Sequence, residues 1–434
     1  MGATGAVAAL IGRVVAVRAG EWTGLVAAFG YNFLLFTAYY ILRPIRDSMG
    51  IEGGVENLDD LFGFTFLGML LAVPLFGWVA GRFRRAVFLP WTYLFFAAQL
   101  VAFWALFTTQ QDIAATAKVF FVWVSVFNLF VISVFWSFMA DLFDKEQGKR
   151  LFAGIAAGAT AGQMCGSGIT TFLAERVGDV NLLLLSAALL ASTIALMRVL
   201  LGWSARRAGT GESHEERLIG GNPFAGLTRV LSSPYLSGIA AFVFLMAAVN
   251  TVLYIQQANL LDIHYPDRNE RTAFLGGIEL VLSWTTLLLQ VFAVGHLTRR
   301  AGVAAMIVVV PLFVVAGFLL IAAQPLLMTL VAVYIARRVG QYAIVRPCRE
   351  MLYTTVDRES KYKAKNVNDT LVYRGSDWAV AKGQEAIAAN WAVGLPGMAF
   401  IGAGLAALWA VVAFGLGRAH ERMAGARTDA GSGS

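Results

Sequence analysis

A short motif with two arginines occurs twice in this sequence. The segment 40–47 reads Tyr-Ile-Leu-Arg-Pro-Ile-Arg-Asp, and the segment 343–350 reads Ala-Ile-Val-Arg-Pro-Cys-Arg-Glu. The proline removes a backbone donor and should kink its helix, while arginines three residues apart lie on one helix face. Both copies end a long apolar segment, where a charge must face water or pair with an opposite charge. The motif therefore predicts charged sites inside an apolar molecule.

Two roles remain open for these arginines. In the first, ion pairs of neighbouring residues within each motif close the two ends of a water-filled path; the pairs are Arg46 with Asp47 and Arg349 with Glu350. In the second, the guanidinium groups hold an anion by paired hydrogen bonds. The roles are compatible, because an anion that competes for a gating arginine would couple binding to opening.

Other polar residues lie within or at the ends of the apolar segments. An isolated carboxyl such as that of Glu279 is either a proton carrier or the partner of an arginine. Arg337 or Arg338 either adds positive charge to the wall of an aqueous cavity or pairs with an acidic residue of segment 367–388. That segment is polar, and its charges need a wide aqueous surface. The candidate binding or gating residues are Arg43, Arg46, Asp47, Asp141, Gln257, Glu279, Arg338, Tyr342, Arg346, Arg349, Glu350, Arg374, Asp377 and Lys382.

The elements that carry these residues are expected to be membrane-spanning helices. Of the 434 residues 58% are hydrophobic and 14% are charged, whereas a typical soluble domain is about half apolar and a quarter charged. The apolar runs last roughly 20 residues and do not alternate as barrel strands do. Twelve spans are expected, at residues 21–43, 61–81, 86–108, 117–140, 151–173, 181–202, 235–260, 272–297, 303–323, 326–345, 367–388 and 395–416.

A polar central segment divides the spans into two groups of six. We expect an N-terminal bundle over 1–203, a cytoplasmic loop over 204–233, a C-terminal bundle over 234–417 and a cytoplasmic tail over 418–434. Arginines gather in loops on one side, which the positive-inside rule makes the cytoplasm, with both termini there. These loops explain the net charge of +7 without a nucleic-acid partner.

One span carries a regular row of glycines, at residues 154, 158, 162 and 166. A spacing of four places all of them on one helix face and lets another backbone approach closely. The row predicts tight helix packing rather than ligand contact.

The sequence gives no indication of an enzyme. It has no phosphate-binding glycine loop and no nucleophile elbow, and the two cysteines, Cys165 and Cys348, fit no metal spacing and predict no disulfide. The histidines match no zinc spacing; they are His214, His264, His296 and His420. We therefore expect no catalytic residues, no cofactor and no metal.

Two groups of six spans joined by a charged loop resemble the major facilitator superfamily, whose halves each contain two inverted three-helix repeats. The segment 77–85 is similar to that superfamily's glycine-rich loop with clustered arginines, although its usual Asp is missing. The resemblance implies an all-α membrane fold and transport by alternating access.

More specifically, the chain resembles the ATP/ADP translocase family of intracellular bacteria and plastids, a branch of that superfamily. Residues 41–47 are similar to the family's Ile-Leu-Arg-x-x-Lys-Asp, residues 135–141 and 146–152 to its Phe-Trp segment and Glu-Ala-Lys run, and residues 362–365 to its Phe-Lys-(Gly/Ala)-Lys. The resemblance implies a secondary transporter of an anionic, nucleotide-like or phosphorylated solute in the bacterial inner membrane, working by antiport.

Two of the four charges of that family's nucleotide site differ here. Arg46 and Asp141 keep the charges of the family's first-span lysine and fourth-span acid. Leu253 stands where a glutamate is expected, and Asp377 where a lysine is expected. A reversed charge at a phosphate-binding position repels a nucleotide, which indicates a relative whose cargo has changed.

Three functions stay open on this basis. The first is an exchanger of nucleotides or other phosphorylated metabolites. The second is a proton-coupled carrier of another organic anion, which Glu279 and Asp377 favour. The third is a membrane sensor or scaffold that uses the carrier fold without moving solute. The expected partners are the lipid bilayer, a small anionic solute and, in the second case, a proton.

Overall fold

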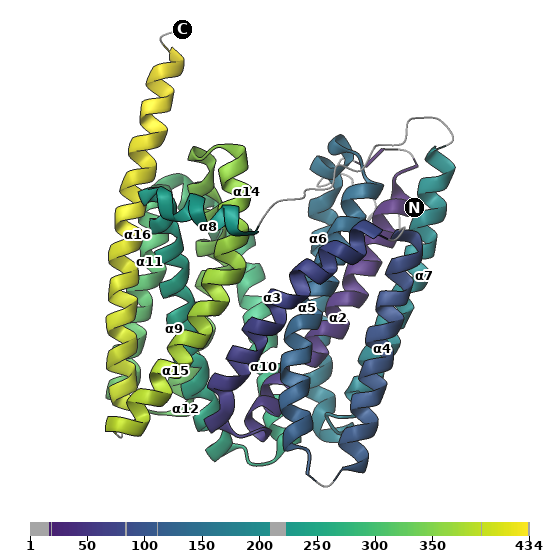
Figure 1. Cartoon of the computed structure of the whole chain (residues 1–434), viewed down its shortest axis with the longest axis horizontal. Helices are drawn as coiled ribbons and strands as arrows, with labels where there is room; N and C mark the ends of the chain where they lie inside the picture. Colours follow the sequence, from purple (N-terminus) through teal and green to yellow (C-terminus); the bar gives the residue numbers. More distant parts are fainter. Residues whose placement is uncertain are drawn as a thin grey trace. The chain divides into compact units, whose positions relative to one another are not determined.

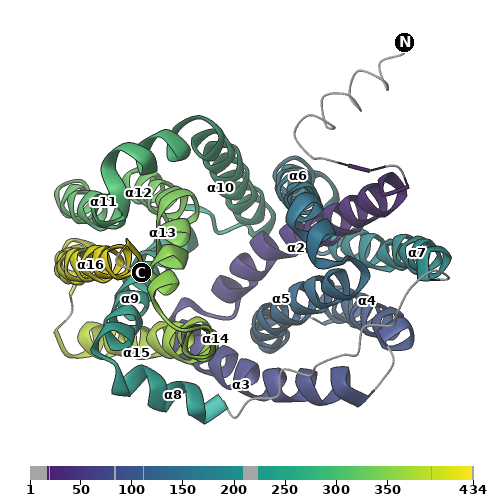
Figure 2. The same cartoon turned by 90° about the horizontal axis from the view of Figure 1, so that it is seen from above.

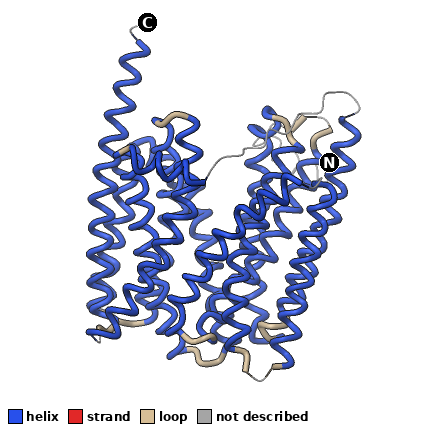
Figure 3. Tube along the Cα trace, viewed as in Figure 1, coloured by secondary structure: helices blue, strands red, loops and turns tan. Residues whose placement is uncertain are grey.

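The computed structural model describes residues 17–18, 20–82, 85–110, 112–208, 223–391 and 393–432. Within these residues the chain forms helices joined by short turns and contains no strand (Figure 3). Helices satisfy their backbone hydrogen bonds internally, as a lipid environment requires. The predicted all-α membrane fold is therefore confirmed.

Every expected span lies mainly within a long helix or a run of consecutive helical segments. The helices are α2 (Trp22–Glu52), α3 (Leu58–Arg82), α4 (Arg85–Thr109), α5 (Ala114–Leu142), α6 (Lys145–Val177), α7 (Leu182–Ala208), α8 (Pro223–Ser232), α9 (Pro234–His264), α10 (Arg268–Leu289), α11 (Gly295–Ala323), α12 (Leu327–Gly340), α13 (Arg346–Leu352), α14 (Arg358–Val367), α15 (Tyr373–Trp391) and α16 (Leu395–Ser432). Two 3₁₀ turns, η1 (Val55–Asn57) and η4 (Tyr353–Thr355), and three π-helical turns, η2 (Gln290–Val294), η3 (Gln341–Val345) and η5 (Asn368–Val372), connect them.

Eight of the described helices are long and apolar enough to cross a bilayer by composition alone. α6 and α15 are not among them. α6 is rich in glycine, and α15 carries Arg374, Asp377 and Lys382. The charged side chains of α15 must be shielded from lipid by neighbouring helices.

The chain forms two compact units, and two helices are divided between them. The first unit contains residues up to Gly53, Leu71–Leu218 and Asp267–Leu280; the second contains Gly54–Leu70, Ile219–Pro266 and Val281–Ser434. α3 therefore begins in the second unit and ends in the first, whereas α10 begins in the first and ends in the second. The bundle boundaries expected at residues 203 and 234 stay a prediction.

In the first unit α2 is the central helix. It packs against α5, α6 and α7, and α4 packs against α7 (Figure 2). Its interior is rich in aromatic rings, and Tyr31 of α2 donates a hydrogen bond to Tyr93 of α4. The first arginine motif lies on this central helix, with Pro44 inside it.

The glycine row of α6 packs against α2. A Cβ atom added at Gly158 or Gly166 would lie 2.5 Å from a backbone oxygen of α2, and one added at Gly162 would meet the carbonyl oxygen of Phe33. Real Cβ atoms do not approach so closely, so these positions require glycine. The predicted tight packing is confirmed at these three residues.

In the second unit α16 runs beside α11 (Figure 1), and α9 packs against both α16 and α15. The second arginine motif begins in the π-helical turn Gln341–Val345 and continues into α13. Pro347 is the second residue of α13, in the first turn of the helix, where a residue without an N–H is tolerated. The two copies of the motif thus have different backbones: one is a continuous helix and the other is interrupted.

Candidate functional site

The first arginine motif forms ion pairs inside the first unit. Arg46 donates to Asp47, with Nη2 2.5 Å and Nε 3.0 Å from the same carboxylate oxygen. The Nε atom of Arg43 lies 3.4 Å from a carboxylate oxygen of Glu279 on α10. The Arg46–Asp47 pair is formed as predicted, and Glu279 is the partner of an arginine.

The second motif pairs differently from the prediction. Arg349 binds Asp369 at 2.9 Å, and Glu350 accepts from Lys365 at 2.8 Å. The expected pair of Arg349 with Glu350 was therefore wrong, because the chain that folds back through α14 and η5 supplies a closer partner to each. Arg346 is exposed, and its guanidinium lies 4.9 Å from the ring centre of Tyr342.

Two adjacent arginines of α12 lie among tyrosines deep in the second unit. Arg338 lies 5.3 Å from the ring centre of Tyr334 and 5.6 Å from that of Tyr342, and donates to both hydroxyls at 3.3 and 3.4 Å. Arg337 is 1% exposed, and its Nη2 donates to the side-chain oxygen of Asn250 at 2.6 Å. We call these five residues the arginine–tyrosine cluster.

Arg337 is the member of the cluster with unused donors. Its Nε and Nη1 atoms are buried and have no hydrogen-bond partner. None of the ion pairs found among the described residues includes Arg337. Because a buried guanidinium normally has all of its donors satisfied, this arrangement is suited to receive an anion.

α15 places a carboxylate beside the cluster. Asp377 is 2% exposed; it accepts from the Thr251 hydroxyl at 2.8 Å on one oxygen and from Arg374 at 3.2 Å on the other. Thr251 directly follows Asn250 in the sequence, and Asn250 accepts from Arg337. Asp377 is thus held by Arg374 and Thr251, and the place of both charged residues in a binding site stays a prediction.

Lys382 belongs to a different group of charges. It binds Asp59, and it lies 3.0 Å from Asp60 and 3.2 Å from Glu385. The two aspartates begin α3, which lies in the second unit at this end. Lys382 therefore holds the first turn of α3 against α15.

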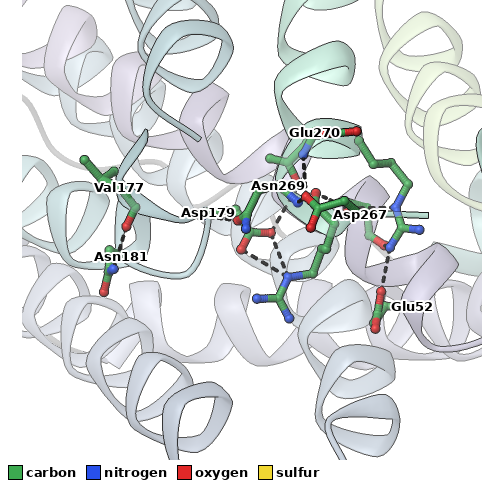
Figure 4. Close-up of polar contacts among 11 residues, drawn as sticks. Glu52, Val177, Asp179, Asn181, Asp267, Asn269 and Glu270 are labelled. Carbon is green, nitrogen blue, oxygen red and sulfur yellow. Dashed lines mark hydrogen bonds and ion pairs between the residues drawn. The ribbon is translucent and has the colours of Figure 1, made fainter. Parts of the chain in front are cut away.

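In the first unit, the first turn of α10 is held in a similar way (Figure 4). The Nε atom of Arg268 lies 3.1 Å from both carboxylate oxygens of Asp179, and Arg271 binds Glu52 at 2.6 Å. Burial raises the pKa of the Asp179 carboxyl, and the positive charge of Arg268 opposes that rise. The backbone N–H of Asp179 donates to the side-chain oxygen of Asn269 at 2.9 Å.

Two further predicted residues are Asp141 and Gln257. Asp141 is exposed near the end of α5. Gln257 is buried on α9, and its side-chain oxygen has no partner. In the part of the chain that the structure describes, no group of three His, Cys, Asp or Glu side chains could hold a metal ion.

Sequence reasoning missed three parts of this geometry. Asn250 was not among the candidates, and Arg337 was ranked behind its neighbour Arg338. The signal available was two adjacent arginines inside an apolar span, which is costly unless both have a function or a partner. The first turn of α10 was missed as well, although its arginines stand directly before an apolar run.

An all-helical membrane protein that buries Arg337 with unused donors has features expected of a solute carrier. The sequence profile of the Major Facilitator Superfamily matches residues 23–348. This chain belongs to that superfamily. It is a multi-pass transporter embedded in the bilayer, not an enzyme.

Known proteins of several kinds are similar to it. "ADP,ATP carrier protein 1" of Chlamydia trachomatis serovar D is 24% identical over 300 residues, which cover 60% of this chain and 56% of that protein. The chain thus matches little more than half the length of this relative.

Solved structures share the fold. The nucleoside transporter NupG is 12% identical with a TM-score of 0.63, over 92% of this chain and 99% of that one. A bacterial homologue of the lysosomal transporter Spinster is 14% identical with a TM-score of 0.60, over 94% and 99%. The D-xylose–proton symporter is 12% identical with a TM-score of 0.60, over 91% and 97%. The named solutes differ widely, so the fold leaves the substrate open.

Proposed function

We propose that this transporter carries an anionic solute by alternating access and that Arg337 is the centre of its binding site. The observation that carries the proposal is the buried guanidinium of Arg337, with two nitrogens that have no partner. A charge buried without a counterion destabilises a protein by several kcal/mol. A bound anion would supply the missing counterion.

The arginines of the first unit provide a contrast. Arg43, Arg46 and Arg268 each contact a carboxylate of their own chain. An internal acid therefore already balances these charges. The arginine–tyrosine cluster adds two tyrosine hydroxyls and their rings at the neighbouring Arg338. Arginine is the residue best suited to binding carboxylates and phosphates.

A second, more specific proposal concerns the chemical class of the anion. A nucleotide-like or phosphorylated cargo, moved by exchange, has the support of the motifs at 41–47 and 135–141 and of the relative named as an ADP,ATP carrier. The clustered arginines of the loops support a bacterial inner membrane orientation with both termini in the cytoplasm.

Uptake into proteoliposomes tests the proposal. Labelled nucleotides, sugar phosphates and small organic acids would be offered to the wild type, to Arg337→Gln and to Arg206→Gln, which changes an exposed arginine at the end of α7. We expect saturable uptake of at least one anion, a loss of at least a hundredfold in Arg337→Gln, and no change in the control. Equal uptake by the wild type and Arg337→Gln would refute the role of Arg337.

A proton-coupled carrier is the second candidate, and Glu279 is the observation that favours it. Its carboxyl is buried, and it lies next to Arg43. Protonation would release the arginine and so couple a proton to movement. Uptake should then follow an imposed pH gradient and lose that dependence in Glu279→Gln; uptake indifferent to the gradient would remove this candidate.

A further inference from the structure

We infer that the binding site around Arg337 extends along α9 and α15 to two buried glutamines, Gln257 and Gln384, which bind a neutral amide-like group of the solute. The inference rests on the proposed function, because it concerns the solute that Arg337 binds. It names the class of that solute: an organic anion with a planar group that carries a hydrogen-bond donor and an acceptor, roughly 10 Å from its charge.

Both glutamines have an unused polar atom inside the second unit. Gln257 of α9 is 4% exposed, and its Oε1 atom has no hydrogen-bond partner. Gln384 of α15 is 5% exposed, and its Nε2 atom has none either. Buried polar atoms are nearly always hydrogen-bonded in folded proteins. This free acceptor and this free donor are therefore available to a ligand.

Two adjacent helices hold the glutamines at the same level. α9 packs against α15 within the second unit. Gln256, directly before Gln257, donates from its Nε2 atom to Oε1 of Gln384 at 3.2 Å. That hydrogen bond holds the amide of Gln384 against α9 and leaves its Nε2 atom as the free donor. A ligand group that binds Gln384 thus lies next to the turn of α9 that carries Gln257.

One face of α9 connects the glutamines to Arg337. Asn250, which accepts a hydrogen bond from Arg337 at 2.6 Å, precedes Gln257 by seven residues. Seven residues are almost two full turns, so Asn250 and Gln257 lie on the same face of the helix, roughly 10 Å apart along its axis. Gln257 and the guanidinium of Arg337 therefore lie on the same side of α9.

The polar contacts between α9 and α15 follow the same direction. Thr251, next to Asn250, donates to Asp377. Further along both helices, Gln256 donates to Gln384. The two helices therefore run side by side from the level of Asn250 to the level of the glutamines, with polar side chains in contact at each end.

The free atoms define the chemistry of the ligand group at the glutamines. Nε2 of Gln384 can donate and Oε1 of Gln257 can accept, so the ligand group needs an acceptor and a donor. Amides, lactams and the edges of nucleobases present both in one plane. These groups are neutral, as are the two glutamine amides. A compact inorganic anion would reach only the arginine.

Two matched pairs of probes test the inference. Ribose 5-phosphate and uridine 5′-monophosphate share a sugar phosphate, and only the second carries a base with an imide group. Heptanoate and suberamate share a carboxylate and an alkyl chain, and only the second ends in a carboxamide. Each would be titrated against the purified protein, with thermal stabilisation as the measure of binding. In at least one pair, the two added hydrogen bonds should make the second member bind the wild type about tenfold or more tightly than the first.

Three substitutions separate the amides from the rest of the structure. Gln257→Met and Gln384→Met keep the approximate length of each side chain and remove its amide. Each should lower the preference for the amide-bearing member about threefold or more, and the double variant should abolish it. Gln99→Met is the control, because Gln99 is an amide of the first unit whose oxygen already accepts from Trp123. It should retain the wild-type preference.

The outcomes distinguish the inference from the proposed function. If Arg337→Gln abolishes binding but the wild type binds both members of each pair equally, the inference is overturned and the proposed function stands. A preference that survives in the double variant, or that Gln99→Met removes as well, also overturns the inference. Binding that Arg337→Gln leaves intact refutes both. If no probe binds the wild type, the inference fails, whereas uptake of another anion that Arg337→Gln abolishes would still support the proposed function.

Discussion

At the scale of single residues, the surroundings of an arginine decide its role. Arg43 and Arg337 are both enclosed arginines on apolar helices, but the first lies beside Glu279 whereas the second has an amide as its partner. The sequence motif drew attention to Arg43 and Arg46 because they repeat. The structure instead indicates Arg337, which lies outside both copies of the motif.

A residue-scale prediction concerns Glu21, which precedes α2. Hydrogen bonds from Arg150, from Gln147 and from the backbone of Arg18 hold the pKa of its carboxyl at about 2. Because the pKa in the folded state is below the ordinary value of 4.5, the ionised carboxylate stabilises the fold above about pH 4.5, and this stabilisation is lost as the pH falls towards 2.

Thermal unfolding of the wild type and Glu21→Gln in detergent measures this contribution. The variant should unfold roughly 2–4 °C below the wild type at pH 7, and the difference should shrink between pH 4.5 and pH 3. Glu146→Gln, which changes an exposed acid nearby, serves as the control. A difference that does not vary with pH would show that the ionisation of Glu21 is not the cause.

At the scale of helices, the contact of α6 with α2 depends on the absence of side chains. Gly162→Ala places a Cβ against the Phe33 carbonyl, so α6 must move away from α2. We expect a loss of about 1–3 kcal/mol in the free energy of unfolding, as is usual for overpacking. Thermal or denaturant unfolding would show it.

Gly168→Ala is the matched control for that prediction. Gly168 lies on the same helix, and nothing lies within 4 Å of a Cβ added there. This variant should match the wild type or exceed it slightly in stability, because alanine favours the helix. Equal losses in both variants would mean that helix propensity, rather than contact with α2, explains the row of glycines.

The helices were predictable from the sequence, and several of their contacts were not. The spans follow from apolar runs of about 20 residues, and the glycine row follows from a spacing of four. The partner of Arg349 was missed because Asp369 comes from η5, after the chain has turned back. Asn250 was missed because it lies on α9, 87 residues before Arg337.

At the scale of the whole molecule, membership of the superfamily fixes the class of the protein but leaves its solute open. Two solved structures with this fold are named for different solutes, one for nucleosides and one for D-xylose. Within this chain, α3 and α10 each begin in one unit and end in the other. The first turn of α3 is held by Lys382 within the second unit, and the first turn of α10 is held by the pair of Arg268 with Asp179 within the first.

The central claim is that Arg337 is kept for binding at the expense of stability. In Arg337→Met an apolar side chain replaces a buried charge that lacks a counterion, which should stabilise the ligand-free protein by about 1–3 kcal/mol. The measurement is thermal unfolding of the wild type and this variant without ligand, alongside anion uptake. We predict a higher unfolding temperature together with lost uptake. A lower unfolding temperature with unchanged uptake would contradict the account.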